Sequence, residues 1–489
     1  MRKILATAAL LAALPIAAQA AKDTVTIGLR GEPPGLDPTV GAAAAISEVT
    51  LYNVFETLTR LDNSGAVLPM LARSWTVSPD GLVYTFKLLE GVKFHDGAAF
   101  DSSDVKFSFE RNQGPKSQNK RKEVFDAMKA IEMPDPLTVV VTLDAPKSLL
   151  AFELAQSTAV MVDPATAENN KTDPVGTGPY KFAKWVKGDS VTLEKFAGHR
   201  DAARVQIVRA TFRFIGDATA QVTGLLAGDI DYIPILGAPE LLSQFKDKGE
   251  FQVLEGTTEG EVILATNNKR LTDVRMRRAL AYAIDRKAVI DAAMFGYGTP
   301  IGSHFAPHHP AYVDLTATYP YDPEKAKALL KEAGYDGREL QLRLPPFDYA
   351  QRAGEIIADM LQKVGVKVKI ENLEWAQWLD QVYKNRQYDL SIVSHVEPMD
   401  MGIYAKSAAD YYFQYESPAF QEIMKKADQA VTREEQFKQL QAGQRHLAED
   451  AVNGYLFQLA KLGVARKGLK GLWTNSPAFL HAIAEMRWE

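Results

Sequence analysis

The chain has 489 residues, of which 46% are hydrophobic and 24% are charged, and its formal net charge is −5. At about 100–200 residues per domain, roughly two to four domains or lobes are expected. The chain contains no cysteine, which excludes disulfides, thiolate metal sites, a cysteine nucleophile and a lipid anchor on an N-terminal cysteine. The slightly acidic charge, without a long basic run, gives no support to nucleic-acid binding.

Residues 1–20 have the pattern of a secretory signal peptide. Two basic residues come first, an apolar stretch follows over 4–18, and Ala-Gln-Ala at 18–20 is a typical cleavage site. The apolar stretch is too short to cross a bilayer, and no later run of about 18 apolar residues follows. We therefore predict an exported protein that begins at Ala21 after cleavage, is not inserted in the membrane and is periplasmic.

The first half of the remaining chain predicts mainly strands, because apolar and polar residues alternate in short runs. The strand candidates are residues 24–30, 83–88, 138–143, 210–215 and 261–266. Turn-rich segments lie at 31–38, 171–180 and 266–273. His95, Asp96, Asp101 and Asp104 crowd together, and we interpret them as a turn and a helix cap, not as a reactive site.

Residues 273–414 predict alternating helices and strands. Asp273 is the expected N-cap of a helix over 274–290, and Asp322 with Pro323 is expected to start another helix that Gly334 ends. Strands are predicted at 339–345, 366–373 and 388–394, with helices at about 349–364 and 375–384 between them. This spacing indicates a βαβαβ unit with a parallel sheet, so the fold class is α/β.

Polar residues follow the third of these strands directly. They are Ser394, His395, Glu397 and Asp400. In open α/β sheets, ligands bind in the crevice beyond the carboxyl ends of the strands. A carboxylate in such a crevice favours a cationic or hydroxyl-rich partner. We predict that this segment binds the ligand; the alternative is a polar loop without a function.

Metal and catalytic sites are weaker alternatives. His304, His308 and His309 lie in a loop, and with His395 and Glu397 they would suit a transition metal, but they lack a defined ligand spacing. Motifs of serine hydrolases and P-loop enzymes are absent from the sequence. Glu397 and Asp400 would suit a glycosidase only with a second face to the site. We predict no catalytic residue, no metal site and no cofactor.

Four segments, in order along the chain, resemble one known family. They are YNVFETLTRLDNSGAVLPMLARSWTVSPDGLVYTFKLLEGVKFHDGAAFDSSDVKFSFER (52–111), DPVGTGPYKF (173–182), DVRMRRALAYAIDR (273–286) and DPEKAKALLKEAGY (322–335). They are similar to the family 5 solute-binding proteins of ATP-driven importers, which take up dipeptides, oligopeptides, nickel chelates and related solutes. The resemblance covers essentially the whole chain after the signal peptide.

The resemblance implies a periplasmic binding protein clamshell of the class II type, with two lobes and an extra subdomain in the first lobe. Lobe I would take residues 22–48, 176–264 and 472–489, the subdomain 49–175, and lobe II 265–471. Two chain crossings, near Ala265 and near Gly471, would form the hinge.

The resemblance also implies the function. The protein would capture a small polar solute, such as a peptide, an amino-acid conjugate or an opine-like compound, between its lobes. It would deliver this ligand to a pair of ABC permease subunits driven by cytoplasmic ATPases, without catalysis and as a monomer. The alternatives are a nickel-type metal-chelate binding protein of the same fold and a secreted hydrolase.

The resemblance extends to candidate ligand-binding residues. Peptide-binding members typically carry a Gly-Trp pair and an aspartate where this chain has Ser394-His395 with Glu397 and Asp400, so the ligand class stays open. Arg30 has two interpretations, a grip on a ligand carboxylate and a salt bridge. Further candidates are Gly31 and Glu32 after the first strand, Asn268 near the hinge, His304 in a loop near the cleft, and Trp375 and Tyr404 for stacking.

Overall fold

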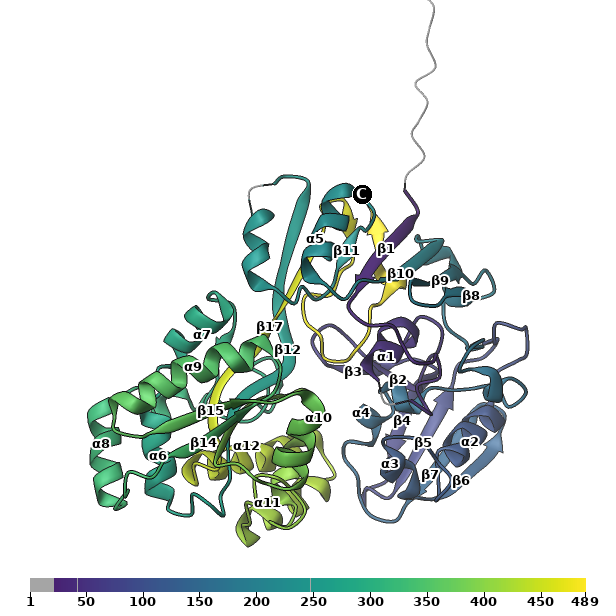
Figure 1. Ribbon diagram of the computed structural model, residues 1–489. Helices are drawn as coiled ribbons and strands as arrows, with labels where there is room; N and C mark the ends of the chain where they lie inside the picture. Colours follow the sequence, from purple (N-terminus) through teal and green to yellow (C-terminus); the bar gives the residue numbers. More distant parts are fainter. Residues whose placement is uncertain (1–21, 42, 247) are drawn as a thin grey trace, which may run out of the picture.

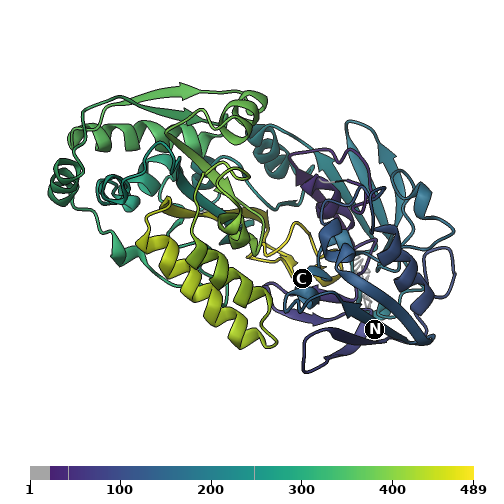
Figure 2. The same cartoon turned by 90° about the horizontal axis from the view of Figure 1, so that it is seen from below.

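The computed structural model describes residues 22–41, 43–246 and 248–489, so the predicted signal peptide lies outside the described residues. The fold is the predicted two-lobed α/β clamshell, with the lobes side by side in two perpendicular views (Figures 1 and 2). One sheet runs through both lobes. Its strand order is β15 (Val368–Asn372), β14 (Leu340–Leu344), β16 (Leu390–His395), β12 (Phe251–Thr266), β17 (Gly454–Arg466), β11 (Tyr232–Ile233), β1 (Thr24–Leu29), β10 (Arg209–Phe214), β9 (Ser190–Lys195) and β8 (Tyr180–Val186), with β13 (Thr299–Pro300) paired to β17.

Lobe I is built around β1, which pairs in parallel with β10 on one side and β11 on the other. The alternation that predicts β1 places Val25, Ile27 and Leu29 in the core. The helix α5 (Ala218–Ala227) begins where the Asp217 side chain accepts a hydrogen bond from the backbone N–H of Ala220. Because β1 and β11 end on the same edge of the sheet, the segments that follow them face the other lobe.

The subdomain has its own four-stranded antiparallel sheet, in the order β4 (Ala72–Val77), β5 (Val83–Leu88), β7 (Thr138–Leu143) and β6 (Met128–Asp135). The strands β5 and β7 have the predicted bounds. The helix α2 (Ser102–Arg111) starts with a capping box formed by Asp101 and Asp104, which confirms the structural interpretation of these acids. The shorter elements are α1 (Ala44–Thr50), β2 (Thr59–Leu61), β3 (Val67–Pro69), α3 (Lys122–Asp126) and α4 (Leu150–Glu153).

Lobe II contains the predicted βαβαβ unit. The strand β14 pairs in parallel with β15 and with β16, and α9 (Asp348–Lys363) covers them. The second connection is α10 (Trp375–Trp378) followed by a π-helical turn, η6 (Leu379–Lys384). The remaining helices are α6 (Val274–Tyr282), α7 (Arg286–Met294), α8 (Pro323–Glu332), α11 (Pro418–Asp428) and α12 (Arg433–Glu449).

The helix caps in lobe II follow the sequence, with one difference. Asp273 and Asp322 cap α6 and α8 through side-chain oxygens that accept backbone hydrogen bonds. The single helix predicted over 274–290 is interrupted, because Asp285 accepts a hydrogen bond from the backbone N–H of Ala288 and starts α7 as a separate helix.

The two lobes are joined by β12 and β17, which form a long antiparallel pair (Figure 1). Their register shifts between Thr257, opposite Ala460, and Glu261, opposite Gln458, so β12 carries extra residues there. Gly260 lies in this bulge, and a Cβ atom added to it would lie 2.9 Å from Thr258 Oγ1. The bulge is therefore tightly packed, and a larger residue at this position would displace neighbouring side chains.

The predicted residue boundaries of the lobes stay a prediction. The sequence places the crossings near Ala265 and Gly471, whereas the register shift lies earlier in the chain than either. Ala265 is still paired with Ser391 of β16. Among the described helices, none is both long and apolar enough to cross a membrane.

Candidate ligand-binding cleft

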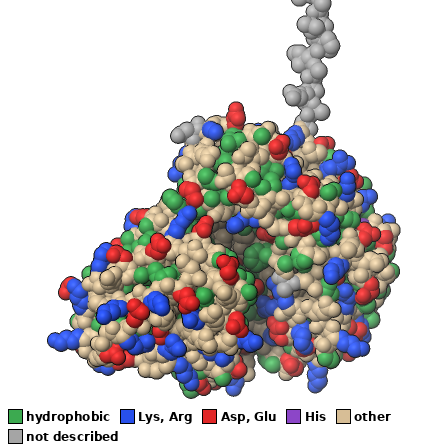
Figure 3. All heavy atoms as spheres, in the orientation of Figure 1, with side chains coloured by type: hydrophobic (Ala, Val, Ile, Leu, Met, Phe, Trp, Pro, Cys, Tyr) green, Lys and Arg blue, Asp and Glu red, His purple; other side chains and the backbone are tan. Residues whose placement is uncertain are grey.

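A cleft of about 410 Å³ lies between the lobes, and a hollow is visible there in Figure 3. This volume is within the range of small-molecule sites, which is about 300–1,000 Å³. Both lobes contribute to its lining. We call the lobe I wall the residues Arg30, Lys120, Arg121, Gln156 and Gly237, and the lobe II wall the residues Phe347, Asp348, Tyr349, Arg352, Val396 and Glu397.

Arg30 of the lobe I wall directly follows β1 and is exposed to the cleft. Its guanidinium packs against Gly237, where an added Cβ atom would lie 2.5 Å from Arg30 Nη1. Among the described residues, no carboxylate is paired with Arg30. A guanidinium fixed at the edge of a cleft without an acid beside it is suited to a ligand carboxylate.

Lys120 and Arg121 bring two further positive charges to the lobe I wall from the subdomain. Arg121 is 2.5 Å from Glu153 and 2.9 Å from Glu123. Burial lowers the pKa of Arg121, but these two carboxylates outweigh burial and keep the pKa above its ordinary value. Near them, Gln156 Nε2 is buried without a hydrogen-bond acceptor among the described residues. This side of the cleft therefore offers hydrogen-bond donors.

The lobe II wall carries the carboxylates Asp348 and Glu397 together with Arg352. Glu397 has a side chain that is 51% exposed, and its Oε1 lies 3.8 Å from Lys120 Nζ on the lobe I wall. Arg352 reaches across in the same way, with Nη2 3.5 Å from Oε1 of Glu240 in η4 (Pro239–Gln244) of lobe I. Opposite charges thus meet across the cleft at two places.

A buried charge network lies behind the loop that carries Glu397. His304, whose side chain is 1% exposed, lies 2.9 Å from Glu261 Oε2 through Nδ1 and 2.7 Å from Asp400 Oδ1 through Nε2. Asp400 Oδ2 is 3.4 Å from His395 Nδ1, and His395 Nε2 is 2.9 Å from the hydroxyl of Tyr412. The network joins β12, the loop after β13 and the loop after β16.

The pKa shifts in this network follow from burial and charge pairing. Burial lowers the pKa of His304, but Glu261 and Asp400 outweigh burial and raise it to about 10. Burial raises the pKa of Asp400, but His304 and His395 outweigh burial and hold it well below its usual range. Burial raises the pKa of Glu261 despite the attraction of His304. His304 is therefore a buried cation that fixes two acids of different segments.

The comparisons with known proteins decide the family. The model of the bacterial extracellular solute-binding proteins, family 5 (middle region), matches residues 66–405, which is more than half of the chain. This chain is a family 5 solute-binding protein. The glutathione-binding protein GsiB of Pectobacterium atrosepticum is 33% identical over 368 residues, 73% of this chain and 70% of the relative. GsiB of Escherichia coli K12 is 31% identical over 365 residues, 73% and 71%.

Solved structures agree with this family membership. The binding protein AgaA of A. tumefacien R10, in complex with agropinic acid, is 27% identical with a TM-score of 0.77, covering 95% of this chain and 99% of that one. NikZ of Campylobacter jejuni, in complex with Ni(L-His), is 26% identical with a TM-score of 0.77, covering 95% and 97%. Members of this family are the extracytoplasmic solute-binding components of ABC importers, and this protein has that role.

Arg30 and Glu397 are the predicted site residues that line the cleft of this family 5 protein. His304, His395 and Asp400 lie together in the buried network behind it. Four of these five side chains belong to lobe II: Glu397 lines the cleft, and His304, His395 and Asp400 lie in the network behind it. Arg30 lines the cleft from lobe I.

The remaining predicted residues lie outside the lining. Ser394 donates its backbone N–H to the hydroxyl of Tyr349 at 2.9 Å, while its own hydroxyl is buried beside Gly260 without a partner among the described residues. Glu32 accepts hydrogen bonds from Trp185 and Gly188 in the β8–β9 hairpin. Gly31 and Trp375 are exposed, and Trp375 stacks on Trp378. Asn268 donates hydrogen bonds to the carbonyls of Phe413 and Val452, and Tyr404 is buried and accepts a hydrogen bond from Asn453.

Several lining residues were not predicted. Phe347, Asp348 and Tyr349 follow β14 directly, so the same strand-end rule that points to Glu397 applies to them. Lys120 and Arg121 had no such signal, because their position depends on how the subdomain packs against lobe I.

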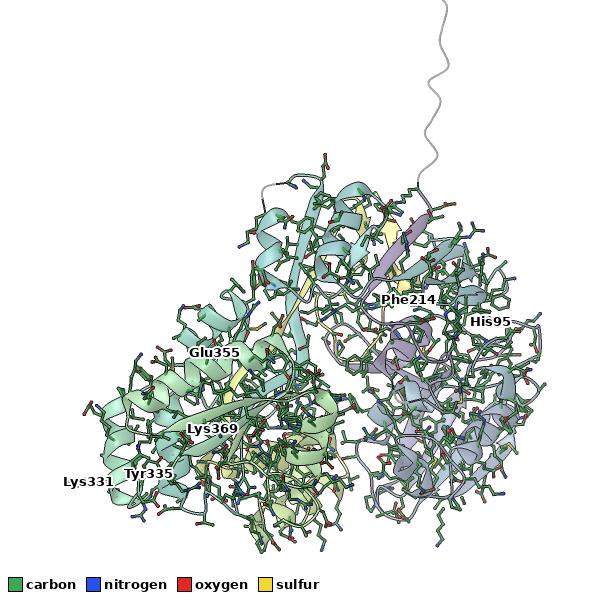
Figure 4. All side chains as sticks on the ribbon, in the orientation of Figure 1. His95, Phe214, Lys331, Tyr335, Glu355 and Lys369 are labelled. Carbon is green, nitrogen blue, oxygen red and sulfur yellow. The ribbon has the colours of Figure 1, made fainter. Side chains whose placement is uncertain are left out.

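His95 lies on the outer side of lobe I, far from the cleft (Figure 4), and burial lowers its pKa to about 4.

The other loop histidines are also paired. His308 Nε2 lies 2.7 Å from Glu259 Oε1 at the bulge in β12, and the ring of His309 stacks on Phe305. Within residues 22–41, 43–246 and 248–489, no group of three or more histidine or acidic side chains is arranged to hold a metal ion.

Proposed function

We propose that the cleft binds an amino-acid-derived solute that carries both a carboxylate and an amine, such as a peptide, an amino-acid conjugate or an opine-like compound. The observation that carries this proposal is Arg30, a positive charge in the cleft that is paired with no described carboxylate. A ligand carboxylate would form charge-assisted hydrogen bonds with it, and the planar guanidinium favours bidentate contact.

The unequal charges of the two walls support this ligand class. The lobe I wall carries Arg30, Lys120 and Arg121, while the carboxylates Asp348 and Glu397 lie on the lobe II wall. A zwitterionic solute would place its carboxylate toward lobe I and its amine toward lobe II. The relatives that bind glutathione and agropinic acid fit this proposal, because both compounds are amino-acid derivatives with carboxylates.

Contacts to both walls would couple binding to closure. A ligand that touches both lobes favours the closed state in proportion to the additional contacts made there. We place the bending point at the bulge between Thr257 and Glu261, where β12 and β17 lose register. The liganded monomer would then dock, in the periplasm, on a pair of permease subunits with their ATPases, and it would release its ligand unchanged.

A thermal-shift screen tests the proposal. The compounds are glutathione, alanyl-glutamate, an opine, a neutral disaccharide and the nickel–histidine chelate. A ligand present at about 100 times its Kd stabilises the folded protein by about 2.7 kcal/mol, so binders raise the melting temperature. We expect stabilisation by compounds that carry a carboxylate and an amine. Stabilisation by the disaccharide or the chelate alone, or turnover of a bound compound, would contradict the proposal.

A further inference from the structure

Two exposed aromatic side chains, Phe347 and Trp375, lie in contact beside the cleft; we call this pair the aromatic platform. Phe347 is 38% exposed and lines the cleft, and Trp375 is 41% exposed. Their ring centroids are 5.2 Å apart. Two adjacent aromatic rings that each leave more than a third of their area exposed beside a ligand site offer a continuous apolar surface on which a partner can stack.

Stacking and hydrogen bonds to neighbouring side chains hold the aromatic platform in place. Trp375 stacks on Trp378 with ring centroids 5.1 Å apart and an interplanar angle of 7°. Trp378 is buried and donates its Nε1–H to Ser391 Oγ at 3.0 Å. On the other side, Phe347 stacks on Tyr349 at 5.7 Å and 10°. Rings fixed in this way lose little conformational entropy when a ligand stacks on them.

The platform continues the cleft. Phe347 lies three residues after the end of β14, and Trp375 lies three residues after the end of the parallel strand β15. Both rings therefore lie at the carboxyl edge of the sheet, where ligands of α/β proteins bind. Val396, exposed and part of the cleft lining, adds apolar surface next to Glu397.

On the basis of the proposed function, we propose that the aromatic platform is a subsite that stacks on a planar or apolar substituent of the ligand. The preferred solute is then an amino-acid derivative that carries its charges at one end and an apolar group at the other. The charged walls hold the carboxylate and the amine, and the platform selects among compounds that share these groups. The continuity of the platform with the cleft favours the ligand as its occupant.

The test uses two matched pairs of compounds: glutathione with S-benzylglutathione, and alanyl-glutamate with phenylalanyl-glutamate. Calorimetry of the full mature protein gives the affinity ratio of each pair. We expect the aromatic member to bind about tenfold more tightly. Trp375→Ala should reduce this ratio to about twofold or less while leaving the affinity for the unsubstituted member nearly unchanged. Phe347→Ala, a change in the cleft wall itself, should reduce the ratio in the same way.

A matched control is Tyr383→Ala. Tyr383 is 44% exposed, lies on the same helical segment about two turns beyond Trp375, and contacts Trp378, Tyr411 and Tyr412, not Phe347. It should leave both ratios unchanged.

Each other outcome has a definite meaning. Equal weakening of both members of a pair by Trp375→Ala would show that the opposite lobe covers the platform on closure, and would overturn the proposal. Concentration-dependent sedimentation that Trp375→Ala abolishes, with unchanged ratios, would assign the platform to self-association and would also overturn it. If none of the four compounds bound and no compound with a carboxylate and an amine stabilised the protein in the thermal-shift screen, the proposed function itself would fail. Binding with ratios near one, or stabilisation by the opine alone, would refute the platform alone.

Discussion

The two sides of the loop after β16 carry similar residues in opposite environments. Glu397 faces the cleft with half of its side chain exposed, and its neighbour across the gap is a single lysine at 3.8 Å. His395 and Asp400, only a few residues away, face the interior and join His304 and Glu261 in a buried network. One side is therefore available to a ligand, whereas the charges of the other side are already paired.

The difference shows what each set of charges does. Charges that are buried and paired mainly fix the relative positions of the segments that carry them, and removing one member leaves the other unpaired in a low-dielectric interior. Glu397 at the cleft is half exposed and only weakly paired with Lys120, so a ligand can replace that partner at small cost. The network holds the loop in place, and Glu397 presents its carboxylate from that loop.

The largest effect is expected from breaking the network. His304→Ala would leave Glu261 as an uncompensated buried acid and Asp400 with His395 as its remaining partner, and we expect a loss of about 3–5 kcal/mol in the free energy of unfolding. Urea titration monitored by circular dichroism measures this loss. The control is His446→Ala, because His446 pairs with Asp450 at 3.5 Å in a more exposed position; it should cost less than about 1 kcal/mol. Equal losses in the two variants would contradict the role of the network.

The same variant gives a pH dependence. His304 has a folded pKa of about 10, above the ordinary value of 6.5, so its contribution is complete below pH 6.5 and is lost as the pH rises toward 10. The difference in the free energy of unfolding between the wild type and His304→Ala should therefore shrink by up to about 1.4 kcal/mol per pH unit across this window. Urea midpoints at pH 6.5, 7.5 and 8.5 measure it. A difference that stays constant or grows would contradict a charged His304.

Arg30→Gln tests whether a charge on the cleft side contributes to ligand binding without contributing to stability. Hydrogen bonds to a charged group contribute about 1.5–3 kcal/mol, so we expect ligands with a carboxylate to bind about 10–100-fold more weakly. The free energy of unfolding should stay unchanged, since no described carboxylate pairs with this arginine. Calorimetry measures the affinity, and Arg204→Gln is the control, because Arg204 is also in lobe I and is 87% exposed. An unaltered affinity in Arg30→Gln would remove Arg30 from the site.

Glu397→Gln should have the smallest effect. The glutamine keeps the shape and one hydrogen-bond acceptor, so we expect about fivefold weaker binding of ligands with an amine. Stability should change by less than about 0.5 kcal/mol, because the pair with Lys120 is exposed. Calorimetry with an amine-bearing ligand and with its N-acetylated analogue tests whether the amine is the partner of Glu397. The variant should then weaken only the binding of the ligand with the free amine. If both lose affinity equally, the amine is not the partner of Glu397.

The contrast also shows how far sequence reasoning extends. The helix caps at Asp273 and Asp322 and the parallel βαβαβ unit depend on residues close in the chain, and the sequence predicts them. The position of Glu397 beyond β16 follows from the general location of ligands in α/β sheets. Arg30 similarly is the last residue of the predicted strand at 24–30.

The network could not be predicted in the same way. Glu261 meets His304 and Asp400 only because β12 and β16 pair with Glu261 opposite His395, and because the 303–311 loop folds over that pair. The contact of Lys120 with Glu397 depends on the packing of the subdomain and on the angle between the lobes. Neither long-range contact leaves a pattern in a single sequence, and acidic and histidine residues in one loop look alike whether they are buried or exposed.

The central claim is that Arg30 binds the carboxylate of a solute held between the two lobes. The most direct test is a calorimetric cycle with the tightest-binding compound of the screen and its carboxamide analogue, each titrated into the wild type and Arg30→Gln. We predict that amidation weakens binding to the wild type at least about tenfold and barely affects binding to Arg30→Gln, because the same interaction is removed from either side. Fully additive losses would show that the carboxylate lies elsewhere and would contradict the account.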